Sequence, residues 1–416
     1  MKILVIGSGG REHALCWKLK QSPLVEQLYC SPGNAGIALI AQCLGGQPVE
    51  VARQLGADFV VVGPEVPLAD GVVDQLKEAG IPAFGPSGQA AQLEASKIFC
   101  KEILQKYNIP TAKAAWFDDA DSATAYLNEQ PDGPIVLKAD GLAAGKGVVV
   151  AANLDEAREA VAGLFAMQGA TPRLLIEECM TGEEVSLIAL TDGENVVPMV
   201  PAQDHKRIGE GDTGPNTGGM GCYSPVPAFT AQLHEQAMET ILKPTVAAMK
   251  AEGLTYRGAL YAGLMLTPEG PKVVEFNCRF GDPETQVILP RLQSDLLPLL
   301  MACAEDATTP LTEVPCEWTA DAAVCVVLAA GGYPANDYRK GDAITGLAEA
   351  EATGATVFHA GTTGRDSDIV TNGGRVLGVT ALGSDFHQAR ENCYRAIEQI
   401  QFEGAYFRRD IGWRCL

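Results

Sequence analysis

The first hundred residues alternate short apolar segments with segments of helical character. "KILVIG" at 2–7, "ADFVVVGPE" at 57–65 and "IPAFGP" at 81–86 are apolar, and helical stretches begin near Glu12 and Leu68 between them. This order predicts a parallel sheet, because parallel neighbours are joined by crossover helices. Ligands of such sheets bind beyond the carboxyl ends of the strands, so we expect a binding site there.

The turn after the first apolar segment contains Gly7 and Gly9, which match the start of the G-x-G-x-x-G fingerprint of dinucleotide-binding folds. Glu12 stands where the third glycine belongs, and no acidic residue ends the second strand to hold a ribose hydroxyl. These two departures disfavour a nicotinamide cofactor. A phosphate at the N-terminus of the following helix remains a fitting ligand, because helix N-termini present free backbone N–H groups.

Charge and composition narrow the class of protein. The net charge of -21 argues against nucleic acid, whose phosphates require a basic face. The longest apolar run, at 322–330, is about half as long as a membrane span and predicts a buried strand. The 12 cysteines form no C-x-x-C pair, and the start does not resemble a signal peptide. We therefore expect a cytoplasmic protein that binds neither nucleic acid nor a membrane.

A glycine-rich loop, "KADGLAAGKGVVV" at 138–150, has some features of a phosphate-binding loop. It departs from the Walker pattern, because only three residues separate Gly141 from Gly145, and Lys146 is followed by Gly147 instead of a magnesium-binding hydroxyl. The loop is therefore either an ordinary turn between two strands or a flap that covers phosphates in another way.

The segment "VVEFNCRFGDPETQ" at 273–286 carries the densest polar chemistry. Side chains alternate faces along a strand, so Glu275, Asn277 and Arg279 share one face opposite an apolar one. A carboxylate and an amide oxygen suit a hard cation such as Mg²⁺, which completes its shell with phosphate oxygens and water. The alternative is a solvated strand face, and the adjoining apolar face and glycine turn favour the metal site.

Other charged residues are ambiguous when taken singly. Lys97 and Lys138 lie among apolar neighbours and could each bind phosphate or face solvent. Glu177 and Glu184 flank a turn that could accept ribose hydroxyls or be a solvated acidic turn. The irregular segment 196–225 holds six glycines between positions 209 and 221, and long irregular segments inside compact domains are usually functional.

Beyond residue 320 the chain is rich in β-forming residues. Asn372-Gly373, within "DIVTNGGRVLGVTAL", predicts the tight turn of a hairpin. A last helix is expected at 384–402. The chain has no G-x-S-x-G or H-E-x-x-H motif, which disfavours serine hydrolysis and histidine-bound zinc.

Taken together and in order, these motifs resemble those of the ATP-grasp enzymes, and within them the phosphoribosylamine-glycine ligase family from end to end. The motifs that carry the resemblance are "GSGGREHAL", "SPGNAG", "VVGPEVPLADG", "EASK", "KADGLAAGKGVVV", "EECMTGEEVS", "QDHKR", "GPNTGGMG", "EFNCRFGDPETQ" and "RRDIG". The resemblance implies a mixed α/β and α+β architecture, an ATP-grasp fold flanked by two smaller domains. Its domains would be an N-terminal parallel-sheet domain at 1–100, a central ATP-grasp domain at 101–120 and 191–320, a lid at 121–190 and a small β-rich domain at 321–416.

The resemblance also implies an activity: an ATP-dependent carbon-nitrogen ligase of purine biosynthesis. It would join glycine to 5-phosphoribosylamine through a glycyl phosphate and release ADP and phosphate. The expected cofactors are ATP and Mg²⁺ or Mn²⁺, and the expected state is a monomer acting on small molecules.

The family's functional residues carry over onto matching positions. ATP binding falls to Lys97, Lys138, Gly145, Lys146, Gly147, Glu177, Glu178, Met180 and Glu184. Metal binding falls to Glu275 and Asn277, and catalysis to Arg279 and Lys138. Substrate binding falls to Gly9, Gly10, Arg11, Asp204, Lys206 and Arg279.

One departure concerns the second metal position, because many ATP-grasp enzymes carry an acidic ligand where this chain has Ala262. A second ion would then depend on phosphate oxygens, Asp282 or Glu284. Two alternatives remain at this point: an ATP-grasp ligase or carboxylase with another acceptor, and a regulatory protein that binds nucleotide without catalysis. The motifs "GSGGREHAL", "QDHKR" and "GPNTGGMG" favour the glycine ligase over biotin carboxylase.

Overall fold

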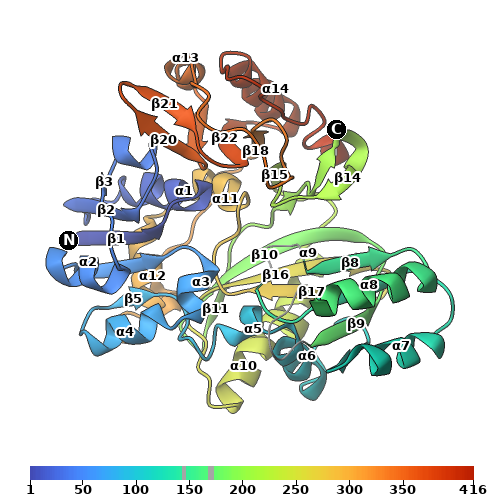
Figure 1. Ribbon diagram of the computed structural model, residues 1–416. Helices are drawn as coiled ribbons and strands as arrows, with labels where there is room; N and C mark the ends of the chain where they lie inside the picture. The colour runs from blue at the N-terminus through green and yellow to red at the C-terminus, as the bar shows by residue number, and fades with distance from the viewer. Residues whose placement is uncertain (143–146, 167–172) are drawn as a thin grey trace.

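The computed structural model describes residues 1–142, 147–166 and 173–416 (Figure 1). Its N-terminal part is a five-stranded parallel sheet in the order β3-β2-β1-β4-β5. The strands are β1 (Lys2–Gly7), β2 (Gln27–Pro32), β3 (Gln42–Cys43), β4 (Phe59–Val62) and β5 (Ala83–Phe84). The helices that connect them are α1 (Gly10–Leu19), α2 (Pro48–Leu55), α3 (Glu65–Ala69) and α4 (Val72–Glu78). The predicted parallel sheet is thus confirmed, with the apolar β1 buried at its centre.

The range expected for the lid, 121–190, overlaps a four-stranded antiparallel sheet in the order β6-β9-β7-β8, and this unit is named the lid below. It begins earlier than that range and ends with β9, because β10 (Glu183–Thr191) belongs to the central sheet. Its elements are β6 (Ala114–Phe117), α7 (Ala120–Asn128), β7 (Ile135–Ala139), β8 (Val148–Ala151), α8 (Leu154–Ala166) and β9 (Leu174–Glu178). The two helices pack against each other and form with the sheet a small hydrophobic core of their own. In Figure 1 this green and teal unit lies apart from the N-terminal sheet, with the central sheet between them.

The central sheet is also antiparallel, in the order β11-β10-β16-β17. Its strands are β10 (Glu183–Thr191), β11 (Val196–Pro198), β16 (Gly258–Thr267) and β17 (Gly270–Asn277). The helices α5 (Gln92–Ala95), α6 (Lys97–Lys106) and α9 (Ala231–Ala237) contact β17, and α10 (Lys243–Ala251) packs on α6. Two later helices, α11 (Thr285–Arg291) and α12 (Leu296–Ala302), pack against α1 of the N-terminal part. A π-helical turn at Met238–Leu242 joins α9 to α10, so the helical segment is continuous from α9 to the end of α10.

The C-terminal part contains a five-stranded antiparallel sheet in the order β12-β15-β18-β22-β19. Its elements are β12 (Gln203–Asp204), β15 (Gly221–Ser224), β18 (Ala322–Ala329), α13 (Leu347–Ala352), β19 (Thr356–His359), β22 (Arg375–Gly383) and α14 (Phe386–Ile397). The expected buried strand within 322–330 is confirmed as β18. Two of the strands belong to the irregular glycine-rich segment, which therefore joins the central part of the chain to the C-terminal sheet.

The hairpin predicted around Asn372-Gly373 is wrong. The hairpin pairs β20 (Thr362–Arg365) with β21 (Asp368–Thr371), whereas β22 pairs with β18 and β19. Gly373 serves close packing instead of a turn, since a Cβ there would lie 2.8 Å from the Cα of Gly361. The mostly buried β22 is held in the large sheet, where its apolar side chains are covered. Among the described residues, no helix is long and apolar enough to cross a membrane.

Candidate active site

The candidate metal-binding residues lie at the end of β17. Glu275 pairs with Gly263 of β16, and the neighbouring Phe276 is buried on the opposite face, as the strand alternation predicts. The Glu275 side chain is 44% exposed, and its Oε1 atom lies 3.9 Å from the Lys206 ammonium, which also pairs with Glu184. Its recessed position would raise the pKa of Glu275, but the charges of Lys206 and Lys138 outweigh this and lower it. The carboxylate is therefore ionised and open to a ligand.

This donor set fits a hard divalent cation. The carboxylate of Glu275 and the amide of Asn277 come from one strand face, and Mg²⁺ readily takes a few protein oxygens together with phosphate and water. No group of three or more His, Cys, Asp or Glu among the described residues could hold a metal by itself. Ala262 lies on β16 opposite Phe276 and adds no oxygen ligand. A metal here would depend on phosphate oxygens from its partner nucleotide.

Lys138, at the end of β7, belongs to a buried ion triad. Its ammonium lies 2.6 Å from Glu177 Oε2 and donates a 3.0 Å hydrogen bond to the carbonyl of Val274 on β17. The other oxygen of Glu177 lies 2.7 Å from the ammonium of Lys101. Burial would raise the pKa of Glu177, but Lys138 and Lys101 outweigh it and lower the pKa. Both oxygens of Glu177 are thus engaged by lysines, and the triad ties the lid to the central sheet.

Lys101 is a member of this triad that the sequence does not single out, and its role is to hold Glu177. It lies on α6 four residues after Lys97, and this spacing places the two on one side of the helix. That spacing is the one signal of the pair in the sequence. Lys97 itself donates a 2.6 Å hydrogen bond to the carbonyl of Gly141 at the start of the glycine-rich loop. Burial lowers the pKa of Lys97, although the nearby Glu275 opposes this.

The remaining expected ATP-binding residues fall on or near the loop and the strand end. Gly147 is buried, and its carbonyl accepts a 2.7 Å hydrogen bond from the Ala139 backbone. Gly145 and Lys146 lie outside the described residues. The N–H of Glu178 donates a 3.0 Å hydrogen bond to the Lys113 carbonyl, so this N–H is not free for a nucleotide. Met180 follows the strand and is half-buried.

A cavity of about 410 Å³ opens at the carboxyl ends of β1, β2 and β4, where the parallel sheet predicts a ligand. The first turn of α1, with Gly9 and Arg11, lines it together with Asp282, whose Oδ2 accepts a 3.2 Å hydrogen bond from the Arg11 N–H. The structure explains why Glu12 stands where a dinucleotide-binding fold would have its third glycine. Its carboxylate accepts a 2.6 Å hydrogen bond from the Gly9 N–H, and a Cβ on Gly63 would lie 2.1 Å from it.

Arg279 connects this cavity to the central part of the site. Its Nε lies 3.2 Å from Glu65 Oε2, and its Nη2 lies 3.2 Å from Glu94 Oε1. Burial raises the pKa of Glu94 more than Arg279 lowers it. The structure therefore places Arg279 between acidic groups of the N-terminal and central parts, with 17% of its side chain exposed.

Asp204 lies on β12 beside the glycine-rich turn at Gly219. Burial, and then the charge of Glu284, raise the pKa of Asp204 well above its usual range. Its buried Oδ1 has no hydrogen-bond partner within the described part of the chain. Gly219 has a φ of +112°, and a Cβ there would lie 2.7 Å from that oxygen. An unpaired buried oxygen is costly, so a donor from a ligand would complete it.

Comparison with known proteins covers the whole chain. The N, ATP-grasp and C domains of phosphoribosylglycinamide synthetase match residues 1–94, 95–285 and 323–414. The phosphoribosylamine-glycine ligase of Nostoc sp. is 53% identical, over 100% of this chain and 99% of the relative. The enzyme of that name from Escherichia coli is 52% identical with the same coverage.

Solved structures agree with the sequence relatives. The crystal structure of phosphoribosylamine-glycine ligase from Thermotoga maritima superposes with a TM-score of 0.86 at 32% identity, covering 99% of this chain and 100% of that one. The biotin carboxylase domain of a Hydrogenobacter thermophilus carboxylase shares the fold alone, with a TM-score of 0.72 at 17% identity over 97% of this chain and 91% of that one. From its domains, its relatives and its fold, the chain belongs to the phosphoribosylamine-glycine ligase family of ATP-grasp enzymes.

Proposed function

We propose that this enzyme joins glycine to 5-phosphoribosylamine, using ATP, and forms glycinamide ribonucleotide, ADP and phosphate. One observation carries the proposal. The lid lysine Lys138 donates to the carbonyl of Val274, the neighbour of Glu275 in β17, and its charge lowers the pKa of Glu275. The cavity beside Arg11 is lined in part by Asp282, which follows β17 in the chain. These contacts support neighbouring sites for a nucleotide triphosphate and a phosphorylated amine.

The first half of the reaction is phosphoryl transfer to the glycine carboxylate. A free carboxylate does not accept an amine, because oxide is too poor a leaving group, and phosphate replaces it. Lys97 and Lys138 would hold the ATP phosphates, and Glu184 would accept from the ribose hydroxyls. A divalent ion such as Mg²⁺, held by Glu275 and Asn277, would neutralise charge that builds up on the phosphates.

The second half is attack by the phosphoribosylamine nitrogen on the glycyl phosphate. The turn of Gly9, Gly10 and Arg11 would bind the sugar phosphate at the N-terminus of α1, where the helix dipole and the Arg11 guanidinium favour an anion. Asp204 would accept from a substrate amine, since its buried oxygen lacks a donor. Arg279 would stabilise the negative charge on the transferring group or the glycine carboxylate. Closure of the lid would exclude water, which would otherwise hydrolyse the acyl phosphate.

The same proposal includes a cytoplasmic enzyme that works as a monomer on small molecules. The net charge of -21 supports a protein that stays dispersed through self-repulsion. Sedimentation equilibrium at micromolar concentration tests this part, and a mass of twice 43.8 kDa would contradict it.

The test of the activity is a coupled assay of ADP release with each substrate left out in turn. We expect ADP formation to require both glycine and phosphoribosylamine, and radiolabelled glycine to appear in glycinamide ribonucleotide. ADP release that ignores both substrates would indicate another acceptor, as in a carboxylase. ATP binding without turnover under all conditions would indicate a nucleotide-binding protein without catalysis.

A further inference from the structure

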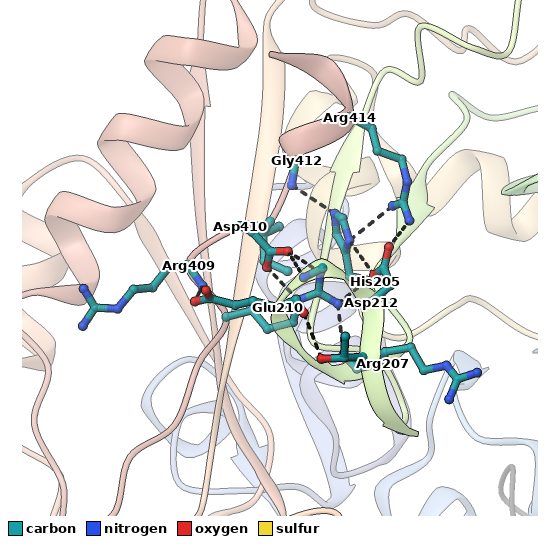
Figure 2. A network of polar contacts seen from close by, with 12 residues as sticks. His205, Arg207, Glu210, Asp212, Arg409, Asp410, Gly412 and Arg414 are labelled. Carbon is teal, nitrogen blue, oxygen red and sulfur yellow. Dashed lines mark hydrogen bonds and ion pairs between the residues drawn. The ribbon is translucent and has the colours of Figure 1, made fainter.

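The C-terminal segment 406–414, called the tail below, binds a hairpin that lies about two hundred residues earlier in the sequence. The hairpin consists of β13 (Arg207–Gly209) and β14 (Thr213–Asn216), joined by a short helical turn. Figure 2 shows side chains and backbone groups of the two segments meeting in one polar network. In Figure 1 the green hairpin lies beside the C-terminus.

Arg408 is the centre of this network and is 0% exposed. Its Nη1 lies 2.9 Å from Asp212 Oδ1 and donates a 3.0 Å hydrogen bond to the carbonyl of Arg207. Its Nε and Nη2 donate to the two oxygens of Asp410 at 2.8 and 2.7 Å. All three nitrogens of the guanidinium are thus engaged, and the planar fork fixes the geometry of both carboxylates.

The same two segments meet at further points. The Gly211 N–H donates to Asp410 Oδ2 at 2.8 Å, and the Arg409 N–H donates to Glu210 Oε1 at 3.1 Å. Arg414 forms an ion pair with the other oxygen of Asp212. The hairpin is therefore held along its length by the tail, in addition to its own backbone ladder.

His205 extends the network to the root of the hairpin. Its Nε2 accepts a 3.0 Å hydrogen bond from the Gly412 N–H, and its Nδ1 lies 3.6 Å from Asp212 Oδ1. Its backbone N–H donates to Gly221 on β15 at 2.8 Å. The side chain of His205 is completely buried and faces the tail.

Lys206 follows His205 and points the other way, into the candidate site. Its ammonium pairs with Glu184 and lies 3.9 Å from Glu275. Burial would lower the pKa of Lys206, but these carboxylates outweigh it and raise the pKa. The carbonyl of Lys206 is fixed by the N–H and hydroxyl of Thr217, at 2.7 and 2.9 Å. A lysine stem has four rotatable bonds, so the position of its charge depends on a fixed backbone.

We propose that Arg408 is a positioning residue: through Asp212 and His205 it fixes the hairpin backbone so that Lys206 stays beside Glu184 and Glu275. This inference rests on the proposed function, in which Glu184 binds the ATP ribose and Glu275 holds the metal ion. A buried Arg paired with carboxylates often gives no more stability than apolar residues of similar volume. Its geometric specificity is the property that an apolar side chain could not replace.

The test is a double-mutant cycle of Arg408→Met with Lys206→Met, assayed for product formation and compared with the wild-type enzyme. Arg395→Met is the matched control, because Arg395 is an exposed arginine of α14 whose ion pair within the described part of the chain is with Glu391, four residues earlier. We expect Arg408→Met to lower kcat by about tenfold to a hundredfold, the scale for a displaced catalytic group, with the Kd of an ATP analogue within about twofold. The double variant should be no slower than Lys206→Met alone, because both changes remove one interaction.

A second readout needs no turnover. Backbone hydrogen exchange at 206–217 should speed up in Arg408→Met, while strands β7 and β10 stay as protected as in the wild type. If Arg408→Met does not fold, Asp212→Asn keeps the size of the side chain and removes one charge of the same network, and the same two readouts apply. Additive loss of kcat in the cycle, or unchanged exchange in the hairpin, would overturn the inference. A wild-type enzyme that makes no product would instead contradict the proposed function, while the exchange result still decides the role of Arg408.

Discussion

The lid and the central sheet each present a glutamate at the candidate site, and the two differ in exposure and in how closely their oxygens are paired with lysines. Glu177 on β9 is 4% exposed, and its two oxygens are each within 2.7 Å of a lysine ammonium. Glu275 on β17 is 44% exposed and has one ammonium 3.9 Å away. The pKa of each is lowered, because nearby lysines outweigh burial. The comparison teaches that an ionised carboxylate is not necessarily a metal-binding residue. It must also have oxygens that no lysine of the protein already occupies.

The largest expected effect comes from Glu177→Gln. This change leaves the ammonium groups of Lys101 and Lys138 buried without a counter-charge, which costs about 3–5 kcal/mol. Native-state hydrogen exchange in β7 and β9 measures the loss of lid stability. The control is Glu269→Gln, an exposed residue, for which we expect a loss within about 0.5 kcal/mol. A loss below about 1 kcal/mol for Glu177→Gln would break the comparison, because it would make the two glutamates alike.

Glu275→Gln should do the reverse, leaving stability almost unchanged and damaging the reaction. We expect kcat to fall by at least about a hundredfold, the scale for removing a key transition-state electrostatic contact. Steady-state kinetics with saturating Mg²⁺ measure this, with thermal melting as the check on folding. Near-normal turnover under those conditions would refute the metal role.

Lys138 and Lys101 bind the two oxygens of the same carboxylate, that of Glu177, but we expect different effects when each is replaced. Lys138→Met should weaken ATP binding by about tenfold, or about 1.4 kcal/mol, since Lys138 is one of the two lysines proposed to hold the phosphates. Lys101 also donates to Thr111 and Ala112, and Lys101→Met should affect stability while ATP binding stays near normal. Titration calorimetry with a non-hydrolysable ATP analogue measures both. Equal Kd values for the wild type and Lys138→Met would contradict the assignment.

The smallest expected effect comes from two histidines that are buried without a counter-charge. Unlike the two glutamates, they are held in the neutral form. Burial lowers the pKa of His13 to about 3, with His359 adding to it, and burial lowers the pKa of His359 to about 4. The unfolded chain therefore binds more protons below pH 6.5, and stability falls as the pH falls. Each histidine should contribute about 1 kcal/mol of loss between pH 6.5 and 5.5.

The variant His13→Gln tests this pH dependence, because glutamine can still accept the 2.7 Å hydrogen bond from the His359 N–H. Urea titration at the two pH values should show a smaller loss for the variant than for the wild type, by about 1 kcal/mol. An identical pH dependence would mean that His13 is already protonated, or exposed, in the folded protein.

Much of the fold was readable from local patterns. The alternation of apolar and helical segments predicts the parallel sheet, because each strand and its crossover helix are written in neighbouring residues. The face shared by Glu275, Asn277 and Arg279 follows from strand alternation in the same way. The order of the motifs is by itself enough to indicate the family.

The partners of these residues came only from the tertiary structure. Local periodicity says which face a side chain occupies, but not which distant backbone lies opposite that face. Gly373 looked like a turn residue, and its use was decided by the approach of Gly361. Glu177 looked like an acceptor for ribose, and its two oxygens were taken by lysines 39 and 76 residues earlier in the chain.

The difference between what the sequence and the tertiary structure determine is clearest for the "RRDIG" motif. The sequence indicates the family to which this motif belongs, but not what its residues do. Arg408 reaches Asp212 across 196 residues of chain, and a contact of that separation leaves no local signal. Burial then decides whether a charge must be paired within the protein. A buried guanidinium without its carboxylates would be strongly destabilising, whereas an exposed guanidinium is solvated by water. The sequence by itself determined the elements, their faces and the family. The tertiary structure decided which charges are paired internally and which stay free for ligands, because pairing depends on burial and distance.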